Sequence, residues 1–304
     1  MDIRRRTLLS ETLHEGGSSE GPINIDNYLT IEARENGLTA KLSTNACEYC
    51  VDGDGNWKSL AAGTATESIN SGQTLSFKGN LTPNSSSGIG TFTISKKCNL
   101  KGNCMSMLFG DNAANNYSLS NKNYAFYKLF YNCANIVSVS DNFLPAKTLA
   151  IYCYSYMFYG CSSLTTSPEL PATKLVNSCY AGMFYNCKNL TTAPELPATT
   201  LAMRCYYNMF YGCSSLTTAP ELPATKLIER CYYGMFRNCT NLNYIKMLAT
   251  DISEYNCLYN WVNKVASTGT FVKNPNMTSL PTGTSGIPIG WTVVNFGEDN
   301  GGGN

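Results

Sequence analysis

The chain has 304 residues and a formal net charge of +1, and only 14% of its residues are charged. No basic patch indicates nucleic-acid binding, because Arg4-Arg5-Arg6 is too short a run to form one. No stretch is long and apolar enough to cross a membrane, so we expect neither a nucleic-acid partner nor membrane insertion.

Residues 1–22 are predicted to be a flexible leader. They are polar, and the run Gly16–Gly21 has the composition of a linker. The leader could also be a docking peptide that becomes ordered when the chain forms a homo-oligomer or assembles into a virion. Both interpretations stay open at this point.

Residues 23–100 are predicted to form a β-sandwich of short strands. Apolar and polar residues alternate in four stretches, as is typical of half-buried strands, and turn sequences such as Asn36-Gly37 separate them. Trp57 is expected to anchor the core of this sandwich. The four stretches are Leu29–Ala33, Leu38–Leu42, Thr74–Lys78 and Thr91–Ser95.

Two motifs in this part of the chain suggest metal ions, and the spacing argues against both. Cys47-Glu48-Tyr49-Cys50 resembles half of a zinc site, but Cys98 and Cys104 are too far apart in sequence for the second half. Asp52–Asn56 begins like a calcium loop, yet Gly63 stands where the twelfth position requires a glutamate. We therefore expect a tight hairpin turn at Asp52–Asn56 and no metal site.

Three consecutive units of 26 residues occupy Cys161–Asn238. Each follows the pattern C-x-x-L-T-T-x-P-E-L-P-A-T-x-L-x-x-x-C-Y-x-x-M-F, and looser copies begin at Cys133 and Cys239. Repeats of this length are typical of solenoids, in which each unit buries its apolar face against its neighbours. We expect an N-terminal cap over 101–132, a solenoid over 133–257, a C-terminal cap over 258–296 and a disordered tail over 297–304.

Each unit is predicted to combine a short extended segment with a helix of about three turns. Within Leu175–Cys187, one Leu, one Met and two Cys recur at every fourth position, the spacing of one helix face. Leu190–Thr192 has the β-branched composition of a brief strand. The predicted fold is therefore mixed α+β, an N-terminal β-sandwich followed by a leucine-rich-repeat-like solenoid with a C-terminal cap.

Most of the 14 cysteines recur at the repeat period. Thiols on an apolar repeat face most simply act as small side chains that fill a tightly stacked core. Disulfide bridges are the alternative, although a cysteine on a helix face has few partners within bridging distance. The two columns are Cys133, Cys161, Cys187, Cys213, Cys239 and Cys153, Cys179, Cys205, Cys231, Cys257.

The repeat resembles the BspA-type leucine-rich repeat family, which is found in surface and phage-associated proteins of gut Bacteroidetes. The residues from Met157-Phe158 to Leu164 match the family's A-F-x-x-C-x-x-L with Met in place of Ala. The family's longer strand is shortened here to Leu-Thr-Thr-x-Pro. The resemblance covers residues 133–257 and implies a repeat surface used for adhesion, for interaction with proteins or as part of a phage tail.

The residues offer little for catalysis. His14 in the leader is the only histidine, so histidine-based catalytic and metal sites are not expected in the folded part. Glu169, Glu195 and Glu221 recur once per unit and would have equivalent surroundings, whereas a general acid and a general base need different ones. We expect these carboxylates to be exposed at the first helical turn. The chain is predicted to be no enzyme and to need no cofactor.

Recognition is expected on the face of each unit opposite the apolar stripe. Core positions are nearly identical between units, whereas this face varies and carries Tyr and Arg, which suit contacts with a glycan or a protein. The alternative is that these tyrosines form ordinary solvated surface. The predicted binding residues are Tyr159, Tyr185, Tyr207, Tyr211, Tyr233 and Arg237.

These features favour a non-enzymatic recognition protein whose partner is a protein or glycan on a cell surface. Residues 1–20 hold no apolar core of a secretion signal, and a virion component needs none, so a phage tail or virion-surface protein that contacts the host envelope is the first hypothesis. A bacterial cell-surface adhesin, with its signal missing from this sequence, is the alternative.

Overall fold

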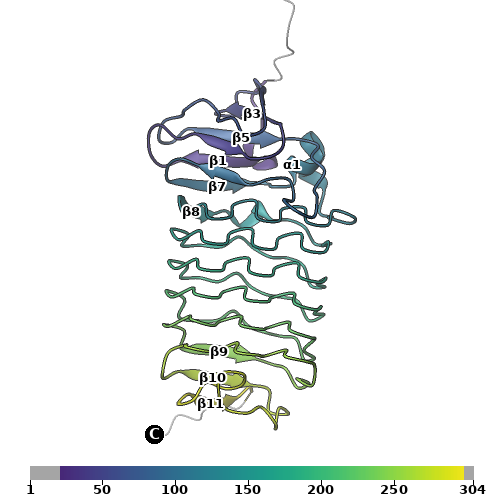
Figure 1. Cartoon of the computed structure of the whole chain (residues 1–304), viewed down its shortest axis with the longest axis vertical. Coiled ribbons are helices and arrows are strands. Elements are labelled where there is room, and N and C mark those ends of the chain that lie inside the picture. The colour runs from purple at the N-terminus through teal and green to yellow at the C-terminus, as the bar shows by residue number, and fades with distance from the viewer. Residues whose placement is uncertain (1–20, 298–304) are drawn as a thin grey trace, which may run out of the picture.

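A computed structural model describes residues 21–297 (Figure 1). The molecule is elongated, with a β-sheet region at the N-terminal end and successive coils of chain stacked below it in parallel layers. The described residues contain one short α-helix, α1 (Ser106–Phe109), and three 3₁₀ turns, at Ile25–Asn27, Gly110–Asn115 and Asp141–Phe143. The fold is therefore mostly β, and the predicted mixture of helices and strands is wrong.

The N-terminal strands form a six-stranded sheet and a two-stranded sheet. The larger has the order β4-β3-β5-β1-β7-β8, and β8 runs parallel to β7, which joins the sheet to the first coils. The smaller pairs β2 with β6. The bounds are β1 (Leu29–Ala33), β2 (Ala40–Leu42), β3 (Cys47–Val51), β4 (Lys58–Leu60), β5 (Thr74–Lys78), β6 (Phe92–Ile94), β7 (Cys98–Gly102) and β8 (Ile136–Val139).

All four alternating stretches of the sequence contain a strand, and two of them, Leu29–Ala33 and Thr74–Lys78, coincide with β1 and β5. The arrangement of these strands as a sandwich stays a prediction. The expected role of Trp57 is wrong, because its side chain is only half-buried. Trp57 directly precedes β4 at the edge of the sheet, where it packs on Tyr28 with ring centroids 5.0 Å apart.

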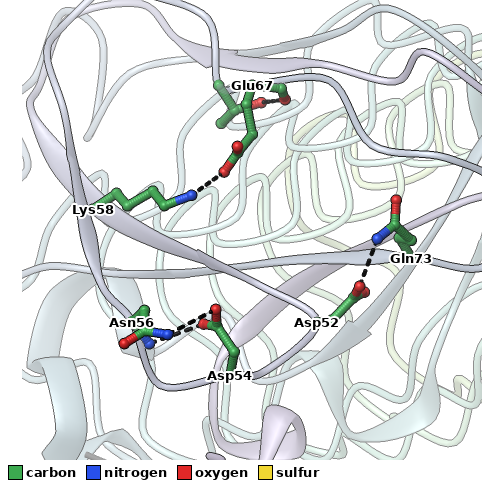
Figure 2. Close-up of polar contacts among 7 residues, drawn as sticks. Asp52, Asp54, Asn56, Lys58, Glu67 and Gln73 are labelled. Atoms are coloured by element: carbon green, nitrogen blue, oxygen red, sulfur yellow. Dashed lines mark hydrogen bonds and ion pairs between the residues drawn. The ribbon is translucent and has the colours of Figure 1, made fainter. Parts of the chain in front are cut away.

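The acidic motif Asp52–Asn56 forms the turn between β3 and β4, as the sequence predicts. Figure 2 shows its carboxylates engaged in different contacts: Asp54 accepts from Asn56, while Asp52 accepts from Gln73 at 2.7 Å. The backbone amide of Asn56 lies 2.9 Å from Asp54 Oδ1. Asp52, Gly53 and Gly55 all have positive φ, so the loop is a compact turn; Asp54 binds the backbone of the loop itself, whereas Asp52 accepts from the Thr74 amide of β5.

The predicted repeat helices are absent from the described residues. Leu175–Cys187 forms a series of tight turns instead, in which an amide donates to the carbonyl three residues earlier, as in Met183 to Tyr180 at 3.2 Å. The intervening amides donate to the next coil, as in Phe184 to Met209 at 2.9 Å. Because alternate amides point out of the coil, each coil is hydrogen-bonded to the next and no α-helix can form.

A left-handed residue at every fourth position produces these turns. In one coil they are Ser178, Gly182 and Asn186, with φ of 55°, 60° and 58°. Three such positions per coil impose a period of four residues, close to the 3.6 of a helix, so the spacing of apolar residues looks helical in the sequence. The equivalent residues of the other coils include Tyr152, Tyr156, Arg204, Asn208, Arg230, Asn256, Asn260 and Lys264.

Asparagine and glycine alternate at two of these left-handed positions. A Cβ on Gly212 would lie 2.3 Å from Oδ1 of Asn186 in the preceding coil, and one on Gly234 would lie 2.0 Å from Oδ1 of Asn208. The asparagine side chain thus lies directly over the glycine of the next coil, which leaves no room for a side chain there. The coils therefore pack in alternating pairs, although the sequence repeats every 26 residues.

The interior of the coils is built from columns of identical residues. Phe130, Phe158, Phe184, Phe210 and Phe236 stack in sequence, with ring centroids 5.6 to 5.7 Å apart. Tyr154, Tyr180, Tyr206 and Tyr232 form a second buried column. The prediction that the apolar stripe faces the core is confirmed, and these aromatic residues pack between adjacent coils.

All fourteen cysteines are buried and free. In one column four thiols donate to a phenylalanine carbonyl of the preceding coil, as in Cys187 to Phe158 at 3.1 Å, and the first, Cys133, donates to Phe92 in β6. Burial raises the pKa of Cys133, Cys153 and Cys239 to about 12. The thiols act as small core side chains that add a hydrogen bond between coils.

Native protein is therefore expected to be almost inert to iodoacetamide at pH 8. Only the thiolate reacts, and a pKa raised from about 9 to about 12 keeps the buried thiols protonated at that pH. In denaturant, all fourteen should be alkylated without prior reduction, as measured by mass spectrometry. Fewer than half reacting without reductant would show that the cysteines are bridged.

The C-terminal strands β9 (Tyr244–Met247), β10 (Thr270–Lys273) and β11 (Thr292–Asn295) form a parallel sheet at the far end of the stack (Figure 1). Phe271 lies in β10 and Val293 in β11. Trp261–Lys264 forms another series of turns. Val293 and Ile289, which both lie within the predicted cap, are 43% and 77% exposed, so the cap itself presents apolar side chains at its surface.

Candidate recognition surface

The outward tyrosines form a stacked column that we call the tyrosine ridge: Tyr131, Tyr159, Tyr185, Tyr211 and Arg237. Successive ring centroids lie 4.6, 4.7 and 4.3 Å apart. The guanidinium of Arg237 lies 5.6 Å from the Tyr211 ring and ends the column. The ridge exists because each tyrosine occupies the same position in its coil, so coil stacking stacks the rings.

Two other predicted binding residues, Tyr207 and Tyr233, lie in a second column. Their rings are 4.7 Å apart, and Tyr233 continues to Tyr259 at 4.9 Å. The structure therefore divides the six predicted residues between two neighbouring columns. Their rings are half-buried by stacking rather than freely solvated.

The hydroxyls of Tyr159 and Tyr185 have a raised pKa and therefore stay protonated over the physiological pH range. Burial raises the pKa of Tyr185, and the neighbouring Tyr211 adds to this through its charge and a side-chain hydrogen bond. Burial also raises the pKa of Tyr159 and Tyr233. Asn238 Nδ2 donates to the Tyr211 hydroxyl at 2.9 Å. The ridge thus presents aromatic edges together with hydroxyls that can donate and accept hydrogen bonds.

A groove of about 400 Å³, which we call the arginine groove, lies beside the second column. Tyr152, Ser178, Arg204, Arg230 and Asn256 line it from equivalent left-handed positions of successive coils. Tyr207 and Tyr233 form part of its wall, with Ala181 and Tyr156.

The groove opens where one coil carries small residues between coils that carry large ones. Tyr152 is followed in its column by Ser178 and then by Arg204, and Ala181 precedes Tyr207 in the next column. Sequence reasoning missed the arginines because a helical wheel does not place these positions outward. The signal was present, however, because this repeat position changes from coil to coil.

The proline-glutamate segments form further grooves, of about 510 and 330 Å³. Glu169, Glu195 and Glu221 line them and are exposed, as predicted, although no helix is present for them to cap. Glu221 accepts from Lys246 Nζ at 2.9 Å. Glu169 and Glu195 occupy the equivalent positions of the two preceding units.

Within residues 21–297, no group of His, Cys, Asp and Glu side chains has the geometry to hold a metal ion. No helix in that range is long and apolar enough to cross a membrane. The leader 1–22 lies almost wholly outside the described residues, as does His14, and so does nearly all of the predicted tail 297–304.

No curated protein and no solved structure matches the chain significantly. One protein-family model does match, the BspA type leucine rich repeat region, in six copies over residues 123–263. The match includes the coil that begins near Tyr124, whose amides already donate to the coil after it, as in Phe126 to Cys153 at 2.7 Å. Residues 123–263 of this protein are therefore a BspA-type leucine-rich repeat region.

Proposed function

We propose that the protein is a non-enzymatic recognition protein that binds a protein or glycan on a cell surface. A BspA-type repeat region suggests a surface or binding protein, and the tyrosine ridge is the observation that carries the finer proposal. The coils would act as a solenoid whose equivalent outward positions form one continuous binding face. Stacked tyrosines suit this role because they are already ordered and lose little side-chain entropy on binding.

The partner depends on where the protein is displayed. On a phage tail or other virion surface, the ridge would contact the host envelope. On a bacterial cell surface, the same ridge would bind another cell or its glycans. Mass spectrometry of purified virions and of membrane fractions distinguishes the two locations directly.

Replacing Tyr185 and Tyr211 together by Ala is expected to weaken attachment to target cells at least tenfold. These rings are the most closely stacked pair of the ridge, 4.3 Å apart, so their loss removes the centre of the proposed contact surface. A tenfold loss corresponds to about 1.4 kcal/mol, modest for two aromatic contacts. Attachment is measured by flow cytometry with labelled protein.

The matched control is Tyr117→Ala with Tyr244→Ala, which removes two partly exposed tyrosines that lie outside the ridge. It should leave attachment unchanged. Because each lost stacking contact costs about 0.5–1.5 kcal/mol, thermal melting must show that the ridge variant is folded at the assay temperature. Unchanged attachment by a folded ridge variant would falsify recognition by the ridge.

A further inference from the structure

We propose that the arginine groove binds a carboxylated oligosaccharide, whose acid group is held by Arg204 and Arg230. This inference rests on the proposed recognition function and names a ligand class and a site for it. The groove is separate from the centre of the tyrosine ridge, because it lies beside the second column, at Tyr207 and Tyr233. The two sites can therefore be tested with different substitutions.

Charge is the first argument for an anionic ligand. Arg204 and Arg230 contribute two guanidinium groups from adjacent coils, and none of the described residues that line the groove carries a carboxylate. Arg230 has one weak contact with an acid, 3.6 Å from Nη1 to Glu229 Oε1. Two adjacent guanidinium groups provide the planar donors that best match a carboxylate.

The position of Arg204 gives an independent argument. Its Nε is buried yet has no hydrogen-bond partner among residues 21–297. A buried, unpaired donor on a charged group is costly, and Arg204 also lines the groove, so its side chain would gain from rotating to meet an incoming acceptor. A carboxylate in the groove would then give Nε a partner through a side-chain movement that leaves the backbone in place.

The remaining wall favours a sugar over a peptide. Ala181 is the largest aliphatic side chain that the described lining provides, so the groove lacks sockets for the apolar side chains of a peptide. Four tyrosines line it instead, and their rings and hydroxyls suit the C–H face and hydroxyl groups of a sugar. Ser178 and Asn256 add polar groups along the floor.

The spacing of the coils suits an extended chain that runs along the stack. Tyr207 and Tyr233 are 4.7 Å apart, which is one coil step and is comparable to the length of a sugar residue. Successive sugars of a uronic acid oligomer could thus contact successive coils, with one of its acid groups held between Arg204 and Arg230.

Isothermal titration calorimetry with tetragalacturonate tests the proposal, and its methyl ester serves as the uncharged control ligand. The acid should bind, and the ester should bind at least tenfold more weakly. Arg204→Gln and Arg230→Gln should each weaken binding of the acid at least tenfold. Arg34→Gln, which removes the same charge from an exposed position in the N-terminal region, should have no effect.

Replacing an arginine could weaken binding by disturbing the structure around it, so a second variant blocks the groove while both arginines are kept. Tyr152 stacks on Tyr124 at 4.8 Å, so Ser178→Tyr can extend this stack by one coil and fill the groove without removing charge. It should abolish binding while melting like the wild type. Sialyllactose, a carboxylated sugar of another kind, shows whether the acid must be a uronic acid.

Three results would overturn the proposal: equal binding of acid and ester, wild-type binding by Arg204→Gln, or no binding of any carboxylated sugar. Equally tight binding of a tetraglutamate peptide would also overturn it and assign the groove to acidic peptides. Failure here is distinguishable from failure of the proposed function, because that function is judged by cell attachment of the Tyr185 and Tyr211 variant.

Discussion

Deleting two whole coils, Cys161–Gly212, is expected to leave a shorter protein that still folds. The hydrogen bonds between coils, the phenylalanine column and the thiol contacts recur along the stack. The two coils that become neighbours after the deletion can therefore make the same contacts with each other. After this deletion Gly160 is followed in its column by Asn238, which preserves the alternation of glycine and asparagine. Circular dichroism and a cooperative melt should match those of the wild type.

Deleting the single coil Cys187–Gly212 should give a less stable protein. Asn186 would then lie over Asn238 rather than over Gly212, where even a Cβ would be 2.3 Å from its Oδ1. Deleting only Cys187–Thr199 should abolish folding, because it removes half of a 26-residue unit, so the rest of the chain is out of register with the neighbouring coils and apolar side chains would face outward. Similar melting of the two-coil deletion and this half-coil deletion would refute a fold assembled from whole coils.

The repeat length and the buried positions could be predicted from the sequence, but the backbone conformation could not. A spacing of four between Cys179, Met183 and Cys187 fits a helix nearly as well as it fits a chain of four-residue turns. The distinction depends on positive φ at Ser178 and at the bulky Arg204 and Tyr152, which rarely adopt it. Hydrogen bonds to the adjacent coils stabilise this conformation, and no local pattern reveals those bonds.

Part of the candidate site could also be predicted from the sequence, namely which tyrosines face outward, but not how they are arranged. Tyr185 and Tyr211 point outward because their place in the unit is opposite the core, whichever backbone carries it. Their stacking follows from the coil spacing, which the helical interpretation did not give. Arg204 and Arg230 occupy left-handed positions that a helical wheel does not recognise as one column, so the groove became visible only with the turns in place.

The Phe184→Ala variant is expected to lose about 3–5 kcal/mol of unfolding free energy, the usual cost of removing a fully buried aromatic ring. Phe184 is fully buried and stacks on Phe158 and Phe210 at 5.7 and 5.6 Å. The cavity cannot collapse easily, because the backbone of Phe184 makes two hydrogen bonds to the part of the chain that follows its coil. Its amide donates to Met209 at 2.9 Å, and its carbonyl accepts from the Cys213 thiol at 3.1 Å.

Tyr185→Ala at the adjacent position provides the matched comparison, because it also removes one ring from a stacked column. The Tyr185 ring centroid lies 4.7 Å from that of Tyr159 and 4.3 Å from that of Tyr211, but the side chain is only half-buried. In the alanine variant, water can therefore occupy part of the space that the ring leaves. We expect it to cost about 0.5–1.5 kcal/mol. Urea unfolding of both variants measures the difference directly. If Tyr185→Ala cost as much as Phe184→Ala, the tyrosine ridge would be part of the structural core rather than a surface available for binding.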